Sequence, residues 1–335
     1  MTDDHDRPSL GRGLPPAAVP LPDVEAAQQA HERPRHDSTR VAAVVLTHDA
    51  PEALGRCLAA LDAQVAPLGA VLVTDCASRF PLDEVARRFE RVEVRRLPEN
   101  LGPAGGYAEA LTAFLDTGFE WAWVMDDDCV PVPDALARQL DVAAPDRVVL
   151  STAQWAETGT VVRGHGWWGA LIHRSVIEAV GVPNPELFWW TEDTEYLQWR
   201  IPKAGVDVTW TEQPLTRVSR ARSDDAKPAW KYYYEARNQV YHRLWVQRPD
   251  HLPLPRPKPK HLRVSVRAWR ATRAVALLTG RAVVREHEDR VPKLGAIARG
   301  TADGVRGRLG ATVAPDTAHR PSITGTVTRE PERSP

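Results

Sequence analysis

The chain has 335 residues and a nearly balanced charge, with 43 Lys and Arg against 44 Asp and Glu. This length is enough for one large domain or two modest ones with a buried core. The balanced charge argues against a global basic field for nucleic-acid binding. The three cysteines, Cys57, Cys76 and Cys129, are far apart and odd in number, which argues against a disulfide framework or a zinc site.

The pattern favours a cytoplasmic protein. No stretch reaches the roughly 18 uncharged apolar residues of a membrane-spanning helix. Acidic residues at the start of the chain, Asp3, Asp4 and Asp6, do not fit a secretory signal. Unpaired cysteines are typical of a reducing compartment.

Buried strands alternate with amphipathic helices after residue 40. Residues 1–40 show no apolar period and are predicted to be a disordered tail. Strands are predicted at 41–47, 70–75, 92–97 and 121–125, and helices from Pro51, around 82–89 and over 107–117, the last after a glycine-rich loop. Such alternation predicts an α/β fold with a mainly parallel, mixed sheet flanked by helices.

The second half of the chain is less regular. Nine of the 12 tryptophans lie between residues 155 and 245, and a helix is predicted from about 230 to 245. A Pro-rich linker at 251–260 precedes a basic helical extension at 261–312 and a disordered tail at 313–335. Aliphatic residues between arginines at 264–284 leave two interpretations of the extension, a helix lying on an anionic membrane or a solvated basic helix.

Polar residues follow three of the predicted strands at the edge where such sheets bind ligands. Thr47-His48-Asp49 end the first strand, Asp75 ends the second, and three consecutive aspartates follow the fourth: Asp126, Asp127 and Asp128. Adjacent carboxylates repel one another, and their oxygens suit Mg²⁺ or Mn²⁺. A solvated acidic turn is the alternative for the triplet taken alone.

Seven motifs in order resemble the family 2 inverting glycosyltransferases of the GT-A fold, with bacterial galactofuranosyl- and rhamnosyltransferases of cell-wall glycan synthesis nearest. They are VVLTHD (44–49), LVTD (72–75), NLGPAGG (100–106), WAWVMDDD (121–128), GWWG (166–169), ELFWWTEDTEY (186–196) and YYYEARN (232–238). The resemblance covers about residues 41–245. It implies a nucleotide-binding half at 41–128 and an acceptor half at 129–250.

The resemblance also implies a donor site. Thr47 and Asp75 match positions that contact the base and ribose of a nucleotide-sugar, and Asn100 matches the segment that closes over it. Gly102 and Gly105 belong to the same closing segment, although a simple turn into the next helix is the alternative for these glycines.

The aspartate triplet takes three roles in this comparison. Asp126 and Asp128 match the residues that hold Mg²⁺ or Mn²⁺ together with the sugar diphosphate. Asp127 is expected to face the sugar.

A second acidic motif matches the catalytic base of the family. The resemblance assigns the base to Asp193, which would take the proton of the acceptor hydroxyl, with Glu192 beside it and Glu195 near the acceptor. A helix start capped by Thr191 is a compatible interpretation of the same stretch.

The acceptor platform is expected to be aromatic. Trp167 and Trp168, between two glycines, match a Trp pair that stacks on sugars, and Trp189 is a further acceptor candidate. Filling of the hydrophobic core is the alternative for each of them.

The chain departs from the family at a metal ligand. The usual His, about thirty residues after the base, is absent from 214–220. His165, His173 and His242 are candidate substitutes for this ligand, but none of them lies at the expected position in the sequence. Arginines of the same stretch could instead meet the diphosphate charge: Arg217, Arg220 and Arg222. Cys76 and the pair Asp49-Ala50 also replace residues common in the nucleotide pocket.

Together these features predict metal-dependent inverting transfer of galactofuranose or rhamnose. The donor would be UDP- or dTDP-linked, and the acceptor a cell-wall glycan or a glycan carried on a polyprenyl diphosphate. A sugar nucleotidyltransferase is disfavoured because residues 48–51 lack its Gly-rich basic loop, and an Asp-nucleophile phosphatase because the aspartates come late. A degenerate sugar-binding or scaffold module is the non-enzymatic alternative.

Overall fold

The computed structural model describes residues 37–219, 227–247, 263–284 and 289–315. The predicted linker at 251–260 and most of both predicted tails lie outside these residues. Within the predicted N-terminal tail, Ser38–Arg40 forms a short 3-10 helix capped by the Asp37 side chain.

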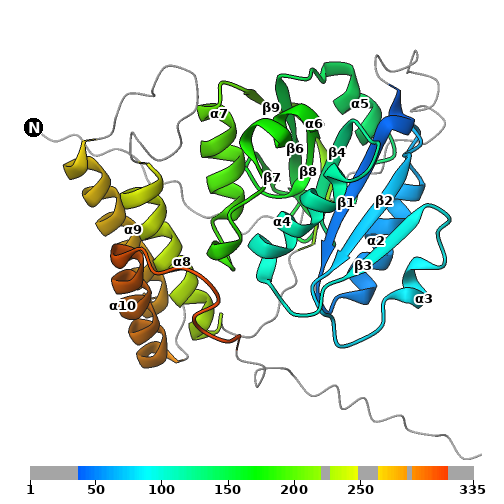
Figure 1. The fold of residues 1–335 in the computed structure, drawn as a ribbon. Helices are drawn as coiled ribbons and strands as arrows, with labels where there is room; N and C mark the ends of the chain where they lie inside the picture. Colours follow the sequence, from blue (N-terminus) through cyan, green and yellow to red (C-terminus); the bar gives the residue numbers. More distant parts are fainter. Residues whose placement is uncertain (1–36, 220–226, 248–262, 285–288, 316–335) are drawn as a thin grey trace, which may run out of the picture.

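One nine-stranded sheet forms the centre of the molecule (Figure 1). Eight strands follow the order β3-β2-β1-β4-β8-β6-β9-β5, and β7 pairs with β6. The strands are β1 (Val41–Thr47), β2 (Ala70–Asp75), β3 (Val92–Arg96), β4 (Trp121–Asp126), β5 (Cys129–Pro131), β6 (Arg147–Trp155), β7 (Val161–Val162), β8 (Trp168–His173) and β9 (Asp207–Val218).

The predicted parallel arrangement holds for the first four strands. β1 pairs in parallel with β2 and β4, and β2 pairs in parallel with β3. Beyond β4 the sheet is mixed, because β8 runs antiparallel to both β4 and β6, and β5 runs antiparallel to β9. Only β6 and β9 pair in parallel there. The sheet is therefore parallel where the first helices cross over and mixed in the Trp-rich half.

Helices lie on both faces of the sheet, with α2 and α5 on one and α4 and α6 on the other. The helices after η1 are α2 (Pro51–Asp62), α3 (Asp83–Ala86), α4 (Gly102–Leu115), α5 (Ala135–Val142), α6 (Arg174–Val180), η2 (Pro185–Leu187), η3 (Thr194–Arg200), α7 (Ile201–Lys203), α8 (Ala229–Tyr241), η4 (His242–Val246), α9 (Val264–Val284) and α10 (Arg290–Arg306). All seven residues of β1 are buried, as expected for a strand covered on both sides.

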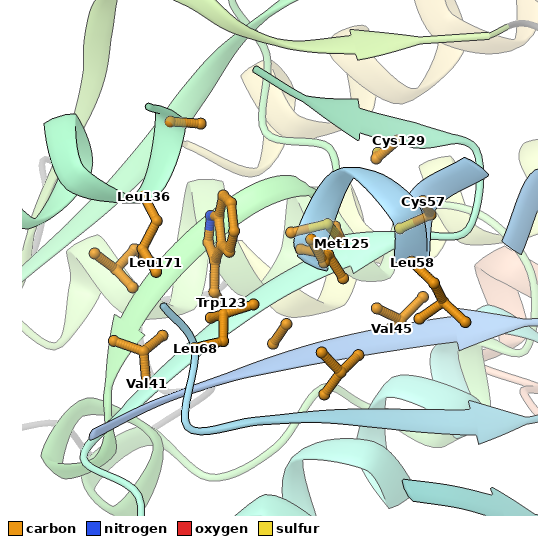
Figure 2. Packing of buried hydrophobic residues seen from close by; sticks show 14 of the residues in the cluster. Val41, Val45, Cys57, Leu58, Leu68, Trp123, Met125, Cys129, Leu136 and Leu171 are labelled. Atoms are coloured by element: carbon orange, nitrogen blue, oxygen red, sulfur yellow. The ribbon is translucent and has the colours of Figure 1, made fainter. Parts of the chain in front are cut away.

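Two apolar layers result from this alternation of side chains along the strands. One layer joins the odd-numbered residues of β1 to α2 and α5, and the other joins the even-numbered residues to α4 and α6. Figure 2 shows the first layer, in which Trp123 lies among Leu68, Leu136 and Leu171. Met125 packs near Cys57 and Cys129, which are free thiols, directly below the end of β4.

The glycine-rich segment is helical, which corrects the predicted loop at 102–106. α4 begins at Gly102, five residues before the predicted start at Tyr107. Gly102 has φ +66°, its N–H donates to the Asn100 side chain at 2.8 Å, and a Cβ there would lie 2.1 Å from the Phe188 carbonyl oxygen. The contact that requires glycine comes from a segment 86 positions later, so the local pattern does not reveal it.

The basic extension forms two helices that pack on α8. Figure 1 shows α8, α9 and α10 together on one side of the molecule, away from α2 and α3. Gly300 and Gly304 let α10 lie against α8, since a Cβ on either would come within 2.5 Å of a backbone oxygen of Tyr233 or Arg237. Among the described helices, none combines the length and the apolar character needed to cross a bilayer.

Replacing Gly102 by alanine tests the close approach of the Phe188 segment to α4. Gly102→Ala should destabilise the protein by about 2 kcal/mol, because alanine is strained at positive φ and its Cβ meets a carbonyl oxygen. Thermal unfolding should show a midpoint several degrees lower. The control is Gly118→Ala, where a Cβ meets nothing within 4 Å and stability should not change. Equal midpoints for both variants would contradict the close contact.

Candidate active site

The polar ends of β1, β2 and β4 meet at one edge of the sheet, as predicted. Thr47 lies opposite Asp75 in the β1–β2 pairing, and Leu46 lies opposite Asp126 in the β1–β4 pairing. Parallel strands place their carboxyl ends on the same side, so the aspartate triplet, Thr47 and Asp75 share one site.

Asp126 is held from below by a tyrosine. The Tyr107 hydroxyl donates to Asp126 Oδ1 at 2.5 Å, and the Tyr107 ring stacks on Trp167 with ring centres 4.4 Å apart. Burial and the Asp128 carboxylate raise the pKa of Asp126 well above its usual range, and the Tyr107 hydrogen bond acts in the opposite direction. The sequence analysis assigned no role to Tyr107, because a buried tyrosine on a helix carries no distinguishing pattern.

Asp127 is paired with Thr47. The Thr47 hydroxyl donates to Asp127 Oδ2 at 2.6 Å. Burial raises the pKa of Asp127 to about 6, while Thr47, His48 and Arg56 act against the shift. The Thr47 hydroxyl is thus engaged in orienting Asp127, and the base contact predicted for Thr47 could use only its remaining acceptor capacity.

Asp128 is the least constrained carboxylate of the triplet. Burial raises its pKa to about 7, and the neighbouring Asp127 charge adds to the shift. Its side chain accepts from the Cys129 thiol at 3.9 Å, and a hydrogen bond from its own backbone N–H lowers its pKa. The end of β9 lies alongside, because the Ser219 N–H donates to the Asp128 carbonyl at 3.2 Å. Arg217 lies opposite Val130 in the β5–β9 pairing, whereas Arg220 and Arg222 fall outside the described residues.

Asp75, at the end of β2, is fixed by the turn that follows it. The Ser78 N–H donates to Asp75 Oδ1 at 2.9 Å, and Arg96 lies 3.9 Å from Oδ2. Asp49 is likewise bound, since it accepts from the Arg79 N–H at 2.7 Å.

His48 links this pocket to the start of α4. His48 Nδ1 lies 2.8 Å from the Cys76 carbonyl oxygen, which can only accept, so Nδ1 is the protonated nitrogen. His48 Nε2 is then free to accept from the Asn100 amide at 3.1 Å. Asn100 and Gly102 therefore lie beside His48, at the edge of the sheet that carries Asp75.

Glu192 and Asp193 lie beside the aspartate triplet. Glu192 is buried, and its charge acts on both Asp126 and Tyr107, which places it next to them although it is 66 positions from Asp126. Burial raises the pKa of Glu192 to about 8, and the Asp193 carboxylate adds to the shift. Glu192 is consequently neutral near pH 7, whereas the half-buried Asp193 is reachable from solvent.

Asp193 lies in the first turn of the helix that follows Thr191. The chain is helical from Glu192 onward and the Thr191 carbonyl accepts from the Glu195 N–H at 2.8 Å, so the predicted helix start after Thr191 is confirmed. Asp193 Oδ1 accepts from the Thr194 N–H at 2.5 Å and from the Thr194 hydroxyl at 3.1 Å. Both bonds end on Oδ1, so within the described residues Oδ2 stays available for another proton donor. Burial raises the pKa of Asp193, and the Thr194 bonds counteract it. Thr191 itself has φ +81°, a conformation unusual for a β-branched residue.

Glu195 does not face an acceptor, contrary to the prediction. It is only 1% exposed, and both of its carboxylate oxygens bind Arg200, with Nε–Oε1 at 3.0 Å and Nη2–Oε2 at 2.8 Å. This forked pairing occupies the carboxylate fully and fastens the helix η3. The role of Glu195 is therefore structural.

Trp167 belongs to the core, which corrects its predicted place in the acceptor platform. It is 2% exposed and lies between Tyr107 and Tyr196, whose ring centres are 4.4 and 5.9 Å away. Its side chain also lowers the pKa of Glu192, which places the indole next to that carboxyl. Trp167 thus supports Asp126 and Glu192 from beneath.

Trp168 and Trp189 are only partly buried and remain candidates for sugar stacking. Trp168 packs edge-on against Trp155 at 5.4 Å. Trp189 packs edge-on against Trp230 at 5.0 Å, and the Lys231 ammonium lies 4.7 Å from its ring centre.

The three histidines considered as substitute ligands lie in other environments. His173 caps α6 and sits opposite Trp121, at the other end of β4 from Asp126. His165 packs against Trp210 and His242 against Trp199. Over the ranges that the structure describes, no group of three or more His, Cys, Asp or Glu side chains is arranged to hold a metal ion.

The donor set nevertheless fits a hard divalent cation. Asp126 and Asp128 offer carboxylate oxygens, and burial, with the charge of neighbouring carboxylates added, raises the pKa of both. A bound cation would relieve this repulsion. Two protein carboxylates with substrate oxygens are a common way to hold Mg²⁺.

Comparison with known proteins gives a consistent result. Residues 42–201 match the family model "Glycosyl transferase family 2". Galactofuranosyltransferase GlfT2 of Mycolicibacterium smegmatis is 26% identical over 211 residues, which is 47% of this chain and 32% of that protein. The match thus spans about a third of the length of this relative.

Two solved structures share the fold. The mannosyltransferase PcManGT of Pyrobaculum calidifontis, in complex with GDP-Man and Mn²⁺, is 17% identical with a TM-score of 0.52, covering 85% of this chain and 94% of that one. TarS of S. aureus (its residues 1–349) is 13% identical with a TM-score of 0.50, covering 80% and 82%.

Replacing Glu192 by glutamine should stabilise the protein in alkaline buffer. The Glu192 pKa rises from 4.5 to about 8 on folding, so folding takes up a proton between these values and stability is lost as the pH rises through that window. Glu192→Gln removes this loss, which is on the order of a few kcal/mol. Thermal unfolding in EDTA should show no gain at pH 4.5 and a gain of several degrees at pH 8.5. A difference independent of pH would contradict the buried neutral state.

Proposed function

This chain carries a glycosyltransferase family 2 domain with the GT-A fold and is a transferase, and we propose that it moves a hexose from a nucleotide-sugar to a glycan acceptor with inversion. One observation carries the proposal. Two acidic motifs that are 66 positions apart, the triplet at the end of β4 and Glu192-Asp193, come together at one edge of the sheet.

Asp193 is the base of the proposed reaction. The acceptor hydroxyl gives its proton to Asp193 Oδ2, its oxygen bonds to the anomeric carbon, and the bond from that carbon to the nucleotide diphosphate breaks. The two hydrogen bonds from Thr194 fix the Asp193 carboxylate in one orientation. Burial raises its pKa, which strengthens Asp193 as a base. Glu192, neutral beside it, adds no second charge.

The donor lies against residues 41–128 in this proposal, and the acceptor against 129–250. Asp75 and Asn100 bind the nucleoside, and Asp127, held by Thr47, faces the sugar. Asp126 and Asp128 would hold Mg²⁺ or Mn²⁺, which when bound would neutralise charge on the departing diphosphate. Arg217 of β9 lies opposite Val130 of β5, two residues after Asp128.

The identities of the sugar and of the acceptor are supported by fewer observations than the reaction type. The name of the mycobacterial relative favours galactofuranose, with rhamnose as the alternative, on a UDP or dTDP carrier. Partly buried aromatic faces at Trp168 and Trp189 suit a carbohydrate acceptor. We propose a cell-wall or polyprenyl-diphosphate-linked glycan, so that the enzyme acts in polysaccharide synthesis.

The outer face of α9 supports peripheral binding to an anionic membrane at the cytoplasmic surface. Its exposed residues combine apolar and basic side chains, and α9 holds no acidic residue. Trp269 is 63% exposed and Leu277 60% exposed, with Arg270 and Arg273 on the same helix. Such a face suits a bilayer surface and would bring a lipid-linked acceptor to the site.

Loss of the base should separate turnover from donor binding. Asp193→Asn should lower transfer about 100-fold or more, because the acceptor proton loses its receiver, while the donor affinity changes less than about threefold. UDP-galactofuranose and dTDP-rhamnose are the donors to screen with Mn²⁺, with mass spectrometry for products and calorimetry for binding. Asp207→Asn, an exposed acid paired with Arg147 away from the site, is the matched control.

Asp128→Asn provides the complementary variant in that experiment. It should weaken Mn²⁺ and donor binding together, since it removes a carboxylate rather than the base. Full transfer by Asp193→Asn, or an unchanged Mn²⁺ response in Asp128→Asn, would refute the respective assignment.

Membrane binding is tested with vesicles. The protein should sediment with vesicles of one-third phosphatidylglycerol and not with neutral phosphatidylcholine, and 0.5 M salt should release it. The double variant Arg270→Ala and Arg273→Ala should bind at least fivefold less. The double variant Arg87→Ala and Arg88→Ala, which removes two exposed arginines beside α3 on the other side of the molecule, is the control. Equal binding by both double variants would exclude α9 as the contact.

A further inference from the structure

Two buried side chains of α8 hold the segment that leads into the catalytic acids. The Asn238 amide nitrogen lies 2.9 Å from the Leu187 carbonyl oxygen and 2.7 Å from the carbonyl oxygens of Trp189 and Trp190. Arg237 Nη2 donates to the same Leu187 oxygen at 2.8 Å and to the Glu186 oxygen at 3.3 Å. Both side chains are 0% exposed. This pair therefore donates hydrogen bonds to four backbone carbonyl groups of one short segment, those of residues 186, 187, 189 and 190.

The held segment is strained. Phe188, Trp190 and Thr191 have φ values of +59°, +68° and +81°, in the left-handed region that side-chain-bearing residues rarely adopt. Three such residues cost several kcal/mol together and persist only where surrounding contacts impose them. Glu192 and Asp193 follow immediately, so the backbone at 186–191 sets where they lie.

The same segment also touches the donor side of the site. The Phe188 carbonyl oxygen accepts from the Ala104 N–H at 3.2 Å and lies against Gly102, at the start of α4. The segment 186–191 thus connects the helix that closes the nucleotide pocket with the acids on the acceptor side.

Residues 310–312, which follow α10, bind the other side of the Arg237 guanidinium. Its Nη1 donates to the Gly310 carbonyl at 2.6 Å and to the Thr312 hydroxyl at 3.2 Å, and the Gly310 N–H donates to the Glu186 carbonyl at 2.7 Å. Its Nε donates to Asn238 Oδ1 at 2.8 Å, which turns the amide nitrogen of Asn238 towards the segment. Figure 1 shows the residues after α10 running across α8.

We propose that Asn238 and Arg237 are positioning residues for transfer. They fix the strained segment 186–191 so that Asp193 faces the acceptor hydroxyl, and the segment 310–312 completes the arrangement. The inference rests on the proposed function, because it takes Asp193 as the base. The YYYEARN motif thereby gains a role at the site although none of its residues touches a substrate.

Asn238→Asp is the sharpest test of the proposal. The change keeps the size of the side chain and the oxygen that accepts from Arg237, but it turns a donor of hydrogen bonds into an oxygen facing three carbonyl oxygens. The control is Asn184→Asp, the same chemical change just before the segment. There the side chain only accepts, from the Glu186 N–H at 3.1 Å, and aspartate can do the same.

Two measurements on the full chain decide the outcome. Hydrogen exchange read by mass spectrometry should show at least tenfold faster exchange in peptides covering 186–193, with the sheet unchanged. Turnover of UDP-galactofuranose or dTDP-rhamnose with Mn²⁺ should show kcat at least tenfold lower and a donor KM within threefold. Asn184→Asp should match the parent protein in both. Thr312→Val, which removes the hydroxyl bound to Arg237 and to Tyr233 but leaves the sequence of α8 intact, should shift both in the same direction by less.

Three results would overturn the proposal: unchanged exchange at 186–193, faster exchange across the whole chain, or local loosening with kcat intact. The second would show that the pair only stabilises the fold, and if Asn238→Asp does not fold, Thr312→Val decides between the same results. A parent protein without transfer to any acceptor would refute the proposed function instead, and the exchange data would still show whether Arg237 and Asn238 hold the segment.

Discussion

Repulsion among buried carboxylates is the constraint on which this site depends. Asp126, Asp127, Asp128, Glu192 and Asp193 converge at one sheet edge, where burial raises the pKa of each. The protein keeps these groups in place by giving most of them a dedicated donor: the Tyr107 hydroxyl for Asp126, the Thr47 hydroxyl for Asp127 and Thr194 for Asp193. Asp128 accepts a weak bond from the Cys129 thiol and one from its own backbone N–H, and a bound cation would compensate its charge.

That constraint explains why rigid elements surround the acids. The parallel strands β1, β2 and β4 fix the triplet, because their register leaves no freedom for a strand end. Glu192 and Asp193 do not follow a strand, and their place must come from other contacts. The strained segment before them and the buried pair on α8 supply these contacts, so the helices after residue 229 serve the site as well as the fold.

Periodicity in the sequence predicts the first four strands, the helix α2 and the gathering of Asp75 and the triplet, because these features depend on local burial and on parallel pairing. The features that were predicted wrongly depend on contacts between segments that are distant in the sequence. The Phe188 carbonyl places the start of α4, Arg200 occupies Glu195, and two tyrosines enclose Trp167. The positive φ of Thr191, which precedes the helix at Glu192, also depends on a distant element, because α8 holds the carbonyls of Trp189 and Trp190.

The Phe188 segment also links the two sides of the reaction. Its carbonyl accepts from Ala104 at the start of the donor-side helix, while the chain four residues later carries Glu192. A shift of this backbone would therefore move the closing helix and the base together rather than either alone. Because a displacement needs the donor and acceptor aligned on one carbon, a single connection between both supports keeps the distance between them constant. The strain at 188–191 is then the consequence of joining two segments that no regular helix or strand could connect.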